Sequence, residues 1–142
     1  MFWPVPIEPI AWESPKDSRK DPIFSLNQKL KDIKVFWIND GHVGPEDIVL
    51  KNDEIYVGYD DGVIMNVDGI FSDTKGRPLG MAFDSNDNLI VADAIQGLIS
   101  IDGSGEVTSL SIKSDSDNIQ FKFVDDLDIA SDGKIYFSDA SS

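Results

Sequence analysis

A short apolar phrase occurs three times in this sequence and constrains the fold more than any other feature. Its copies occupy residues 45–50, 78–83 and 125–130. Each copy is followed by a polar turn and a second apolar run, beginning at Ile55, Leu89 and Ile135. Strand-forming repeats with periods of roughly 20 to 50 residues are typical of β-propeller blades. We therefore predict an all-β chain, a partial β-propeller of four-stranded antiparallel blades.

From residue 44 onward, short apolar runs alternate with turn residues. Gly, Asn and Asp occupy the turns, and these residues accept the positive φ that tight hairpins require. No helix of ordinary length has the right periodicity there. The predicted strands lie at 33–38, 45–50, 54–58, 63–67, 79–84, 88–92, 97–101, 106–110, 126–130 and 134–138. Residues 76–110 match one complete blade, and we expect two such blades to pack face to face.

The beginning of the chain differs from the rest because it is rich in proline, which lacks the amide donor and favours extended, irregular backbone. Residues 1–32 are predicted to form an extended segment that packs on the propeller. Its apolar side chains are Trp3, Ile7, Ile10 and Trp12. Residues 33–142 are predicted to form an incomplete β-propeller of about two blades and the start of a third.

The predicted propeller is incomplete, and this affects how the fragment should behave. The third repeat has only two predicted strands before Ser142. A partial ring exposes sheet faces that a closed propeller covers. We therefore expect the fragment to self-associate and to be inactive without the later blades.

The charge of the chain restricts its partners. There are 26 acidic and 12 basic residues, giving a formal net charge of −14. This field repels nucleic acid and anionic membrane surfaces and attracts cations, although it also serves plain solubility. There is no cysteine, which excludes disulfides and thiolate metal sites. No apolar run approaches the roughly 20 residues of a membrane span, so no anchor is expected within this chain.

Several candidate motifs fail on their spacing. Asp84–Asn88 begins like a calcium-binding loop, but Leu89 and Ile95 stand where glycine and a bidentate acid are needed. A hairpin turn is the better interpretation. His42 is the single histidine and has no nucleophile nearby, so we expect a structural or surface role. One histidine without cysteine also excludes the usual zinc sites.

Two acidic pairs, Glu46–Asp47 and Asp125–Asp126, stand at the start of the first strand of a repeat. Equivalent positions of successive blades converge around a propeller's central channel. Carboxylates gathered there repel one another unless a cation lies between them, and hard oxygen ligands favour calcium or magnesium. They are candidate metal ligands; the alternative is that they are ordinary loop-end acids of an acidic protein.

Three stretches resemble strictosidine synthase-like proteins of the type that includes the adipocyte plasma membrane-associated proteins. They are Gly44–Ile48, Gly76–Asp84 with Asn88–Ala94, and Phe123–Ala130 with Asp132–Ser142. The resemblance implies a six-bladed β-propeller, in the superfamily of gluconolactonases and paraoxonases, of which this chain is the N-terminal part. It also implies export or a membrane anchor for the full-length protein.

The resemblance assigns roles to the acidic pairs. By analogy with paraoxonases, Glu46 and Asp125 would face a calcium ion in the channel, and Asp47 and Asp126 a more buried one. Leu79 stands where paraoxonases carry their catalytic histidine, and it cannot move a proton. The catalytic residues therefore remain unassigned, and Ca²⁺ is the expected cofactor.

The resemblance leaves three functions open. The first is a calcium-dependent hydrolase of the lactonase or arylesterase kind, acting on a small ester or lactone. The second is a strictosidine synthase-type lyase, which condenses an amine with an aldehyde without a metal. The third is a non-catalytic propeller with structural calcium.

Overall fold

The computed structural model describes residues 11, 13, 22, 25–35, 38 and 41–140. The chain divides into two compact units, Met1–Val35 and Phe36–Ser142. No α-helix occurs among the described residues. No helix in this part of the chain is long and apolar enough to cross a membrane.

The described residues of the first unit form turns. The Lys31 amide donates to the Gln28 carbonyl at 3.1 Å, and the Ile33 amide to that of Leu30 at 3.4 Å. Ile33–Val35 is irregular, as is Ile38 in the second unit, so the strand predicted at 33–38 is wrong at these residues. The apolar residues assigned to the extended segment, Trp3, Ile7, Ile10 and Trp12, lie outside the described residues.

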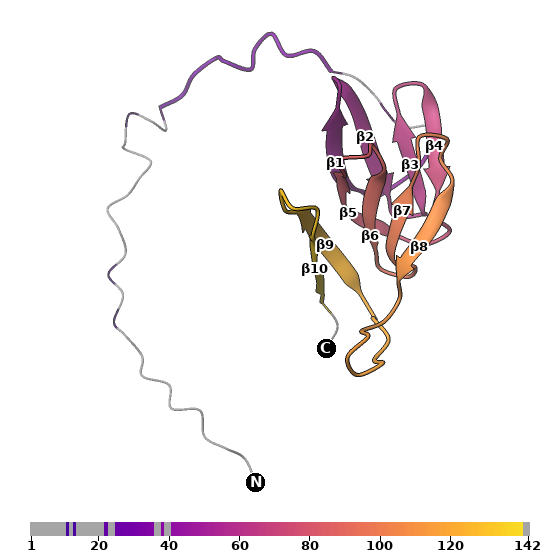
Figure 1. Ribbon diagram of the computed structural model, residues 1–142. Coiled ribbons are helices and arrows are strands. Elements are labelled where there is room, and N and C mark those ends of the chain that lie inside the picture. The colour runs from indigo at the N-terminus through magenta and orange to yellow at the C-terminus, as the bar shows by residue number, and fades with distance from the viewer. Residues whose placement is uncertain are drawn as a thin grey trace. The chain divides into compact units, whose positions relative to one another are not determined.

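The second unit contains two four-stranded antiparallel sheets and a hairpin (Figure 1). The first sheet consists of β1 (Pro45–Lys51), β2 (Glu54–Tyr59), β3 (Val63–Asn66) and β4 (Gly69–Asp73). The second consists of β5 (Pro78–Phe83), β6 (Leu89–Asp93), β7 (Gly97–Ile101) and β8 (Val107–Ser111). The hairpin consists of β9 (Val124–Ile129) and β10 (Ile135–Asp139). Within each sheet the strands are paired in chain order, which confirms the all-β prediction and the four-stranded antiparallel blades.

One strand was missed by the sequence analysis. β4 (Gly69–Asp73) pairs with β3 through a shift in register between Ile64 and Met65. Its five residues include a glycine and a serine and hold only two apolar side chains, so the apolar pattern that marks the other strands is weak there. The backbone pairing with β3, not side-chain pattern, makes this segment a strand.

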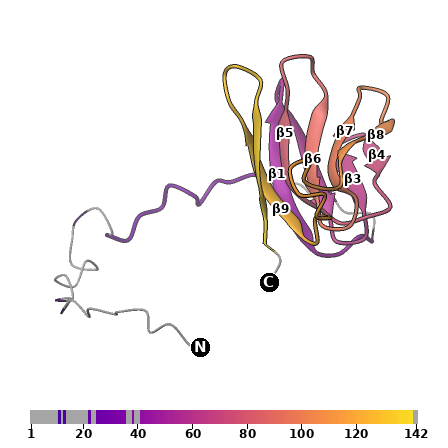
Figure 2. The same ribbon diagram turned by 60° about the horizontal axis from the view of Figure 1, so that its bottom comes forward.

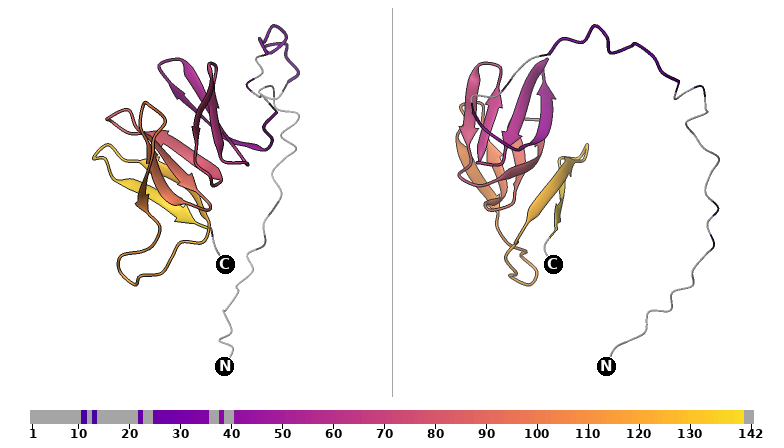
Figure 3. Two further views of the ribbon diagram at one scale, coloured as in Figure 1. Left: turned by 90° about the vertical axis from the view of Figure 1, so that its right-hand side faces the viewer. Right: turned by 180° about the vertical axis from the view of Figure 1, so that it is seen from behind.

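The two sheets pack face to face, as predicted (Figure 3). The core between them contains Tyr56 and Ile64 from the first sheet and, from the second, Met81, Leu89, Val91, Ile99 and Ile101. The Tyr56 ring meets Phe71 and Phe83 edge to face, each at 5.1 Å. This geometry suits the quadrupoles of aromatic rings. Next along β2, Val57 faces the other way, into a second cluster with Tyr59, Val63 and Met65.

The first strands of the three repeats, β1, β5 and β9, lie next to one another (Figure 2). β9 packs along β5 and β6 and buries Val124 completely. The remaining outer faces are less covered. Ile48 and Leu50 on β1 and Tyr136 on β10 are each more than 60% exposed, at 63%, 67% and 63%.

A buried carboxylate holds the loop between the two sheets. Asp93, at the end of β6, is 0% exposed. Its Oδ1 accepts the amides of Arg77, Ile95 and Gln96 at 2.9, 2.8 and 2.8 Å, and its Oδ2 accepts the Thr74 hydroxyl at 2.8 Å. A Cβ at Gly76 would lie 2.2 Å from Asp93 Oδ1, so glycine is needed where the loop crosses this carboxylate.

We expect Asp93→Ala to lower the free energy of unfolding by roughly 3–5 kcal/mol, because it removes a fully buried acceptor from the buried Thr74 hydroxyl and from three partly buried amides. Urea denaturation of the chain measures the loss. Asp139→Ala is the matched control: Asp139 ends β10 as Asp93 ends β6 and accepts the Lys122 and Phe123 amides, but it is exposed. Equal losses in the two variants would show that burial of Asp93 does not matter.

Candidate functional site

The first strand of each repeat carries a β-bulge at the same place. At each bulge, two residues of that strand face one residue of the next strand. The register shifts between Pro45 and Ile48 on β1, between Pro78 and Met81 on β5, and between Val124 and Leu127 on β9. The single residues opposite are small: Gly58, Ala92 and Ser138. The bulged pairs are Glu46–Asp47, Leu79–Gly80 and Asp125–Asp126. A bulge re-aims the side chains it carries, and bulges are common beside active sites.

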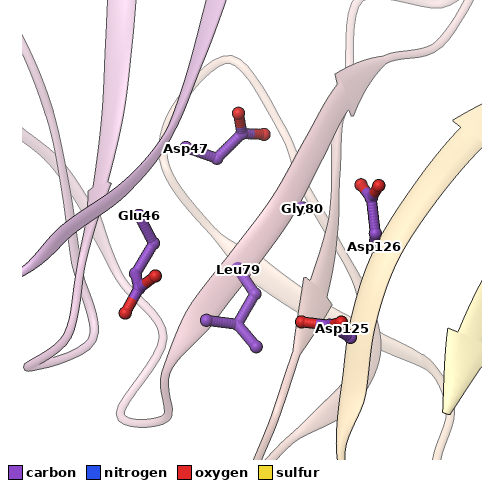
Figure 4. Close-up of a pocket in the computed structure, with 6 residues that line it drawn as sticks. All are labelled: Glu46, Asp47, Leu79, Gly80, Asp125 and Asp126. Carbon is purple, nitrogen blue, oxygen red and sulfur yellow. The ribbon is translucent and has the colours of Figure 1, made fainter. Parts of the chain in front are cut away.

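The six bulged residues line one cavity of about 290 Å³, which we call the bulge pocket (Figure 4). Its lining is Glu46, Asp47, Leu79, Gly80, Asp125 and Asp126. Both predicted acidic pairs therefore reach the same cavity, one from β1 and one from β9, with the neutral pair of β5 between them. Their role as metal ligands remains a prediction.

Asp47 joins the first two repeats. Its Oδ2 accepts the Met81 amide on β5 at 2.8 Å, and its Oδ1 accepts the Ile48 amide at 2.7 Å. In the third repeat, Asp126 Oδ1 accepts the Leu127 amide at 2.8 Å in the same way. Each carboxylate oxygen has two lone pairs, so these hydrogen bonds orient the groups and leave acceptor capacity for another ligand.

Gly80 makes room for the pocket. A Cβ at this position would lie 2.6 Å from Asp126 Oδ1 and 2.8 Å from Asp126 Cα. Real Cβ atoms do not approach so closely, and the Asp126 backbone cannot move aside without shifting β9. Sequence reasoning gave Gly80 no role of its own; the signal was glycine at the position where the other two repeats have aspartate.

Glu46 is held by an arginine that sequence reasoning also missed. Arg77 Nη2 donates to Glu46 Oε1 at 2.6 Å, and Arg77 Nε lies 2.6 Å from Asp60 Oδ1. The hydrogen bond to Glu46, with the charges of Asp60 and Glu46, raises the pKa of the Arg77 guanidinium against the opposing effect of desolvation. Arg77 therefore stays charged and offsets part of the negative charge beside the pocket.

The four carboxylates do not converge on one point. In Figure 4, Asp47 and Asp126 point toward the upper edge of the view, whereas Glu46 points toward the lower edge and Leu79 stands between Glu46 and Asp125. Within the part of the chain that the structure describes, no three His, Cys, Asp or Glu side chains form a group that could hold a metal ion as placed. The donor chemistry nevertheless fits a hard cation, because all four groups are carboxylates around a single cavity.

His42 is not among the pocket's lining residues. Its Nδ1 lies 2.6 Å from Asp61 Oδ2, and its ring lies 5.7 Å from that of Tyr59. The hydrogen bond to His42 lowers the pKa of Asp61, against the opposing effect of desolvation. These contacts fix the turn after β2, which agrees with a structural role.

Comparisons with known proteins place this architecture in a family. Residues 23–67 match the family described as "Strictosidine synthase-like, N-terminal". The chain is 42% identical over 110 residues to Protein STRICTOSIDINE SYNTHASE-LIKE 4 of Arabidopsis thaliana, covering 69% of this chain and 30% of that protein. It is 34% identical over 159 residues to the adipocyte plasma membrane-associated protein of Gallus gallus, covering 98% of this chain and 38% of that protein.

The chain thus spans about a third of the length of the curated relatives it matches. The matched family model describes the N-terminal part of these proteins and includes Glu46 and Asp47. This chain belongs to the strictosidine synthase-like family and corresponds to its N-terminal part.

Proposed function

We propose that this chain is the N-terminal part of a calcium-dependent hydrolase of esters or lactones, with the cation bound at the bulge pocket. One observation carries the proposal: bulges at the same two positions of the first and third repeats direct two acidic pairs into one cavity. Four carboxylates within one small cavity repel one another, and a divalent cation relieves that repulsion. Oxygen-only donors favour calcium over softer metals.

The chain's own residues would divide the work. Asp47 and Asp126, already oriented by backbone amides, would hold the cation. Asp125, on the same bulge as Asp126, and Glu46 would be the remaining oxygen donors. A calcium ion bound there would polarise the carbonyl of an ester or lactone and stabilise the negative oxygen that develops. Leu79 would present an apolar surface to the substrate.

Leu79 also favours a second candidate. The bulge pocket contains an aliphatic side chain between the two acidic pairs and no histidine, lysine or tyrosine. A pocket with carboxylates and no proton-transfer group of another kind suits a cation that stabilises the fold. The second candidate is therefore a non-catalytic propeller in which calcium is structural.

Calcium should stabilise the chain against thermal unfolding. At a free calcium concentration of 100 times Kd, calcium binding adds about 2.7 kcal/mol to the free energy of unfolding. We expect the melting temperature to rise in calcium relative to chelator, and the rise to disappear in Asp47→Asn/Asp126→Asn. Differential scanning calorimetry of both proteins measures it.

The control for this experiment is Asp53→Asn/Asp115→Asn, which removes the same two charges at exposed positions away from the pocket. It should keep the calcium-dependent rise. If both double variants respond like the wild type, the cation binds elsewhere and the bulge pocket is not its site.

Hydrolysis separates the two candidates. We expect a polypeptide of the relatives' full length that contains this chain to hydrolyse aryl esters or lactones in calcium. Asp47→Asn/Asp126→Asn should lower kcat/KM by roughly 100-fold, the scale of losing a group that stabilises an oxyanion. Calcium binding without turnover supports the structural role. Chelator-insensitive condensation of an amine with an aldehyde would instead identify the lyase alternative.

Two relatives, from Gallus gallus and Drosophila melanogaster, are named as plasma membrane-associated, and these names support a proposal for the cellular location. We propose that the full-length protein is exported or membrane-associated. Fractionation of the source cells should find it in the membrane or secreted fraction. A pool confined to the cytosol would contradict this.

A further inference from the structure

Arg77 links the loop between the two sheets to the acidic end of the first repeat. Its guanidinium contacts Glu46 Oε1 through Nη2 and Asp60 Oδ1 through Nε, each at 2.6 Å. Two carboxylates of the first repeat, Glu46 on β1 and Asp60 in the turn after β2, thus pair with the same guanidinium. The side chain is only 36% exposed, so water screens these contacts incompletely.

The arginine is held in place through its backbone. Its amide donates to the buried Asp93 at 2.9 Å, and its carbonyl accepts the Ala94 amide at 3.0 Å. The guanidinium therefore extends from a fixed point toward Glu46. Equivalent positions in the other repeats, one residue before Pro45 and Val124, are Gly44 and Phe123. Neither acidic pair therefore has an arginine at this position in its own repeat; Arg77 belongs to the second repeat, with the neutral pair, and reaches Glu46 of the first repeat.

The hydrogen bond from Arg77 determines the direction in which the Glu46 side chain points. Figure 4 shows its carboxylate pointing away from Asp47 and Asp126, on the far side of Leu79 from Asp125. A glutamate side chain has three rotatable bonds and can turn into the pocket, but doing so breaks the hydrogen bond to Arg77. A divalent cation that recruits Glu46 must therefore displace the guanidinium.

We propose that Arg77 competes with divalent cations for Glu46 and thereby sets the cation affinity of the bulge pocket. The inference rests on the proposed function, since it concerns the same cation. The carboxylates of the pocket then differ in their readiness to bind a cation. Asp47 and Asp126 are oriented by backbone amides, whereas Glu46 is already paired with Arg77.

Isothermal titration of the chain with calcium tests this. We expect Arg77→Gln to bind calcium roughly 10-fold more tightly than the wild type, because it frees Glu46 and removes a neighbouring positive charge. Lys75→Gln is the matched control. It removes the same charge two residues away, where Lys75 pairs with Asp73 outside the pocket and is 77% exposed. That variant should change the affinity by less than about twofold.

Coupling to Glu46 distinguishes competition from a general charge effect. In a Glu46→Gln background, Arg77→Gln should give no more tightening than Lys75→Gln does. A gain that persists without Glu46 would overturn the inference. Circular dichroism checks that each variant is folded. If Arg77→Gln is not, Arg77→Lys carries the test, with a smaller tightening because lysine keeps the charge but loses the planar fork.

The outcomes separate this inference from the proposed function. If Arg77→Gln and Lys75→Gln change the calcium affinity equally, the proposed role of Arg77 is wrong but the calcium site itself is not contradicted. Absence of calcium binding in every variant would overturn both. Tightening that is specific to Arg77→Gln and dependent on Glu46 supports both.

Discussion

The pocket depends on a β-bulge that recurs at the same position in three successive repeats. A regular strand would send neighbouring side chains to opposite faces. The bulge instead places two residues against one, and the small residues opposite, Gly58, Ala92 and Ser138, fit within the crowded pairing. Because β1, β5 and β9 lie side by side, one local distortion repeated three times brings six residues around one cavity.

A second chain of contacts runs from the core to this cavity. Buried Asp93 accepts the amide of Arg77, in the loop that follows β4, and the amides of Ile95 and Gln96, in the turn that follows β6. Arg77 in turn holds Glu46 and Asp60. A carboxylate deep in the second sheet thereby determines where a carboxylate of the first sheet points. The four hydrogen bonds of Asp93 offset the free energy that burial of its carboxylate costs. One of them fixes the backbone of Arg77 and so places the positive charge of that residue at a defined location.

The sequence predicted the strands and the acidic pairs for the same reason: both recur at repeat positions, and a repeat places equivalent residues in equivalent surroundings. It failed for β4, where five residues with little apolar pattern are recruited by pairing with β3. The bulges could not be foreseen, because they are a property of register between strands. Nor could the role of Arg77, which arises from contacts between different repeats, whereas glycine at position 80, where the other two repeats have aspartate, was a signal in the sequence.

The arrangement of charge in the bulge pocket follows from these contacts. Acidic pairs enter from the first and third repeats, and the middle repeat supplies Leu79 and Gly80. Had the middle repeat also been acidic, six carboxylates would share the cavity, and the side chain at position 80 would collide with Asp126. Backbone amides on Asp47 and Asp126, and Arg77 on Glu46, moderate the repulsion that remains. The negative charge that remains in the pocket is what would attract the cation of the proposed function.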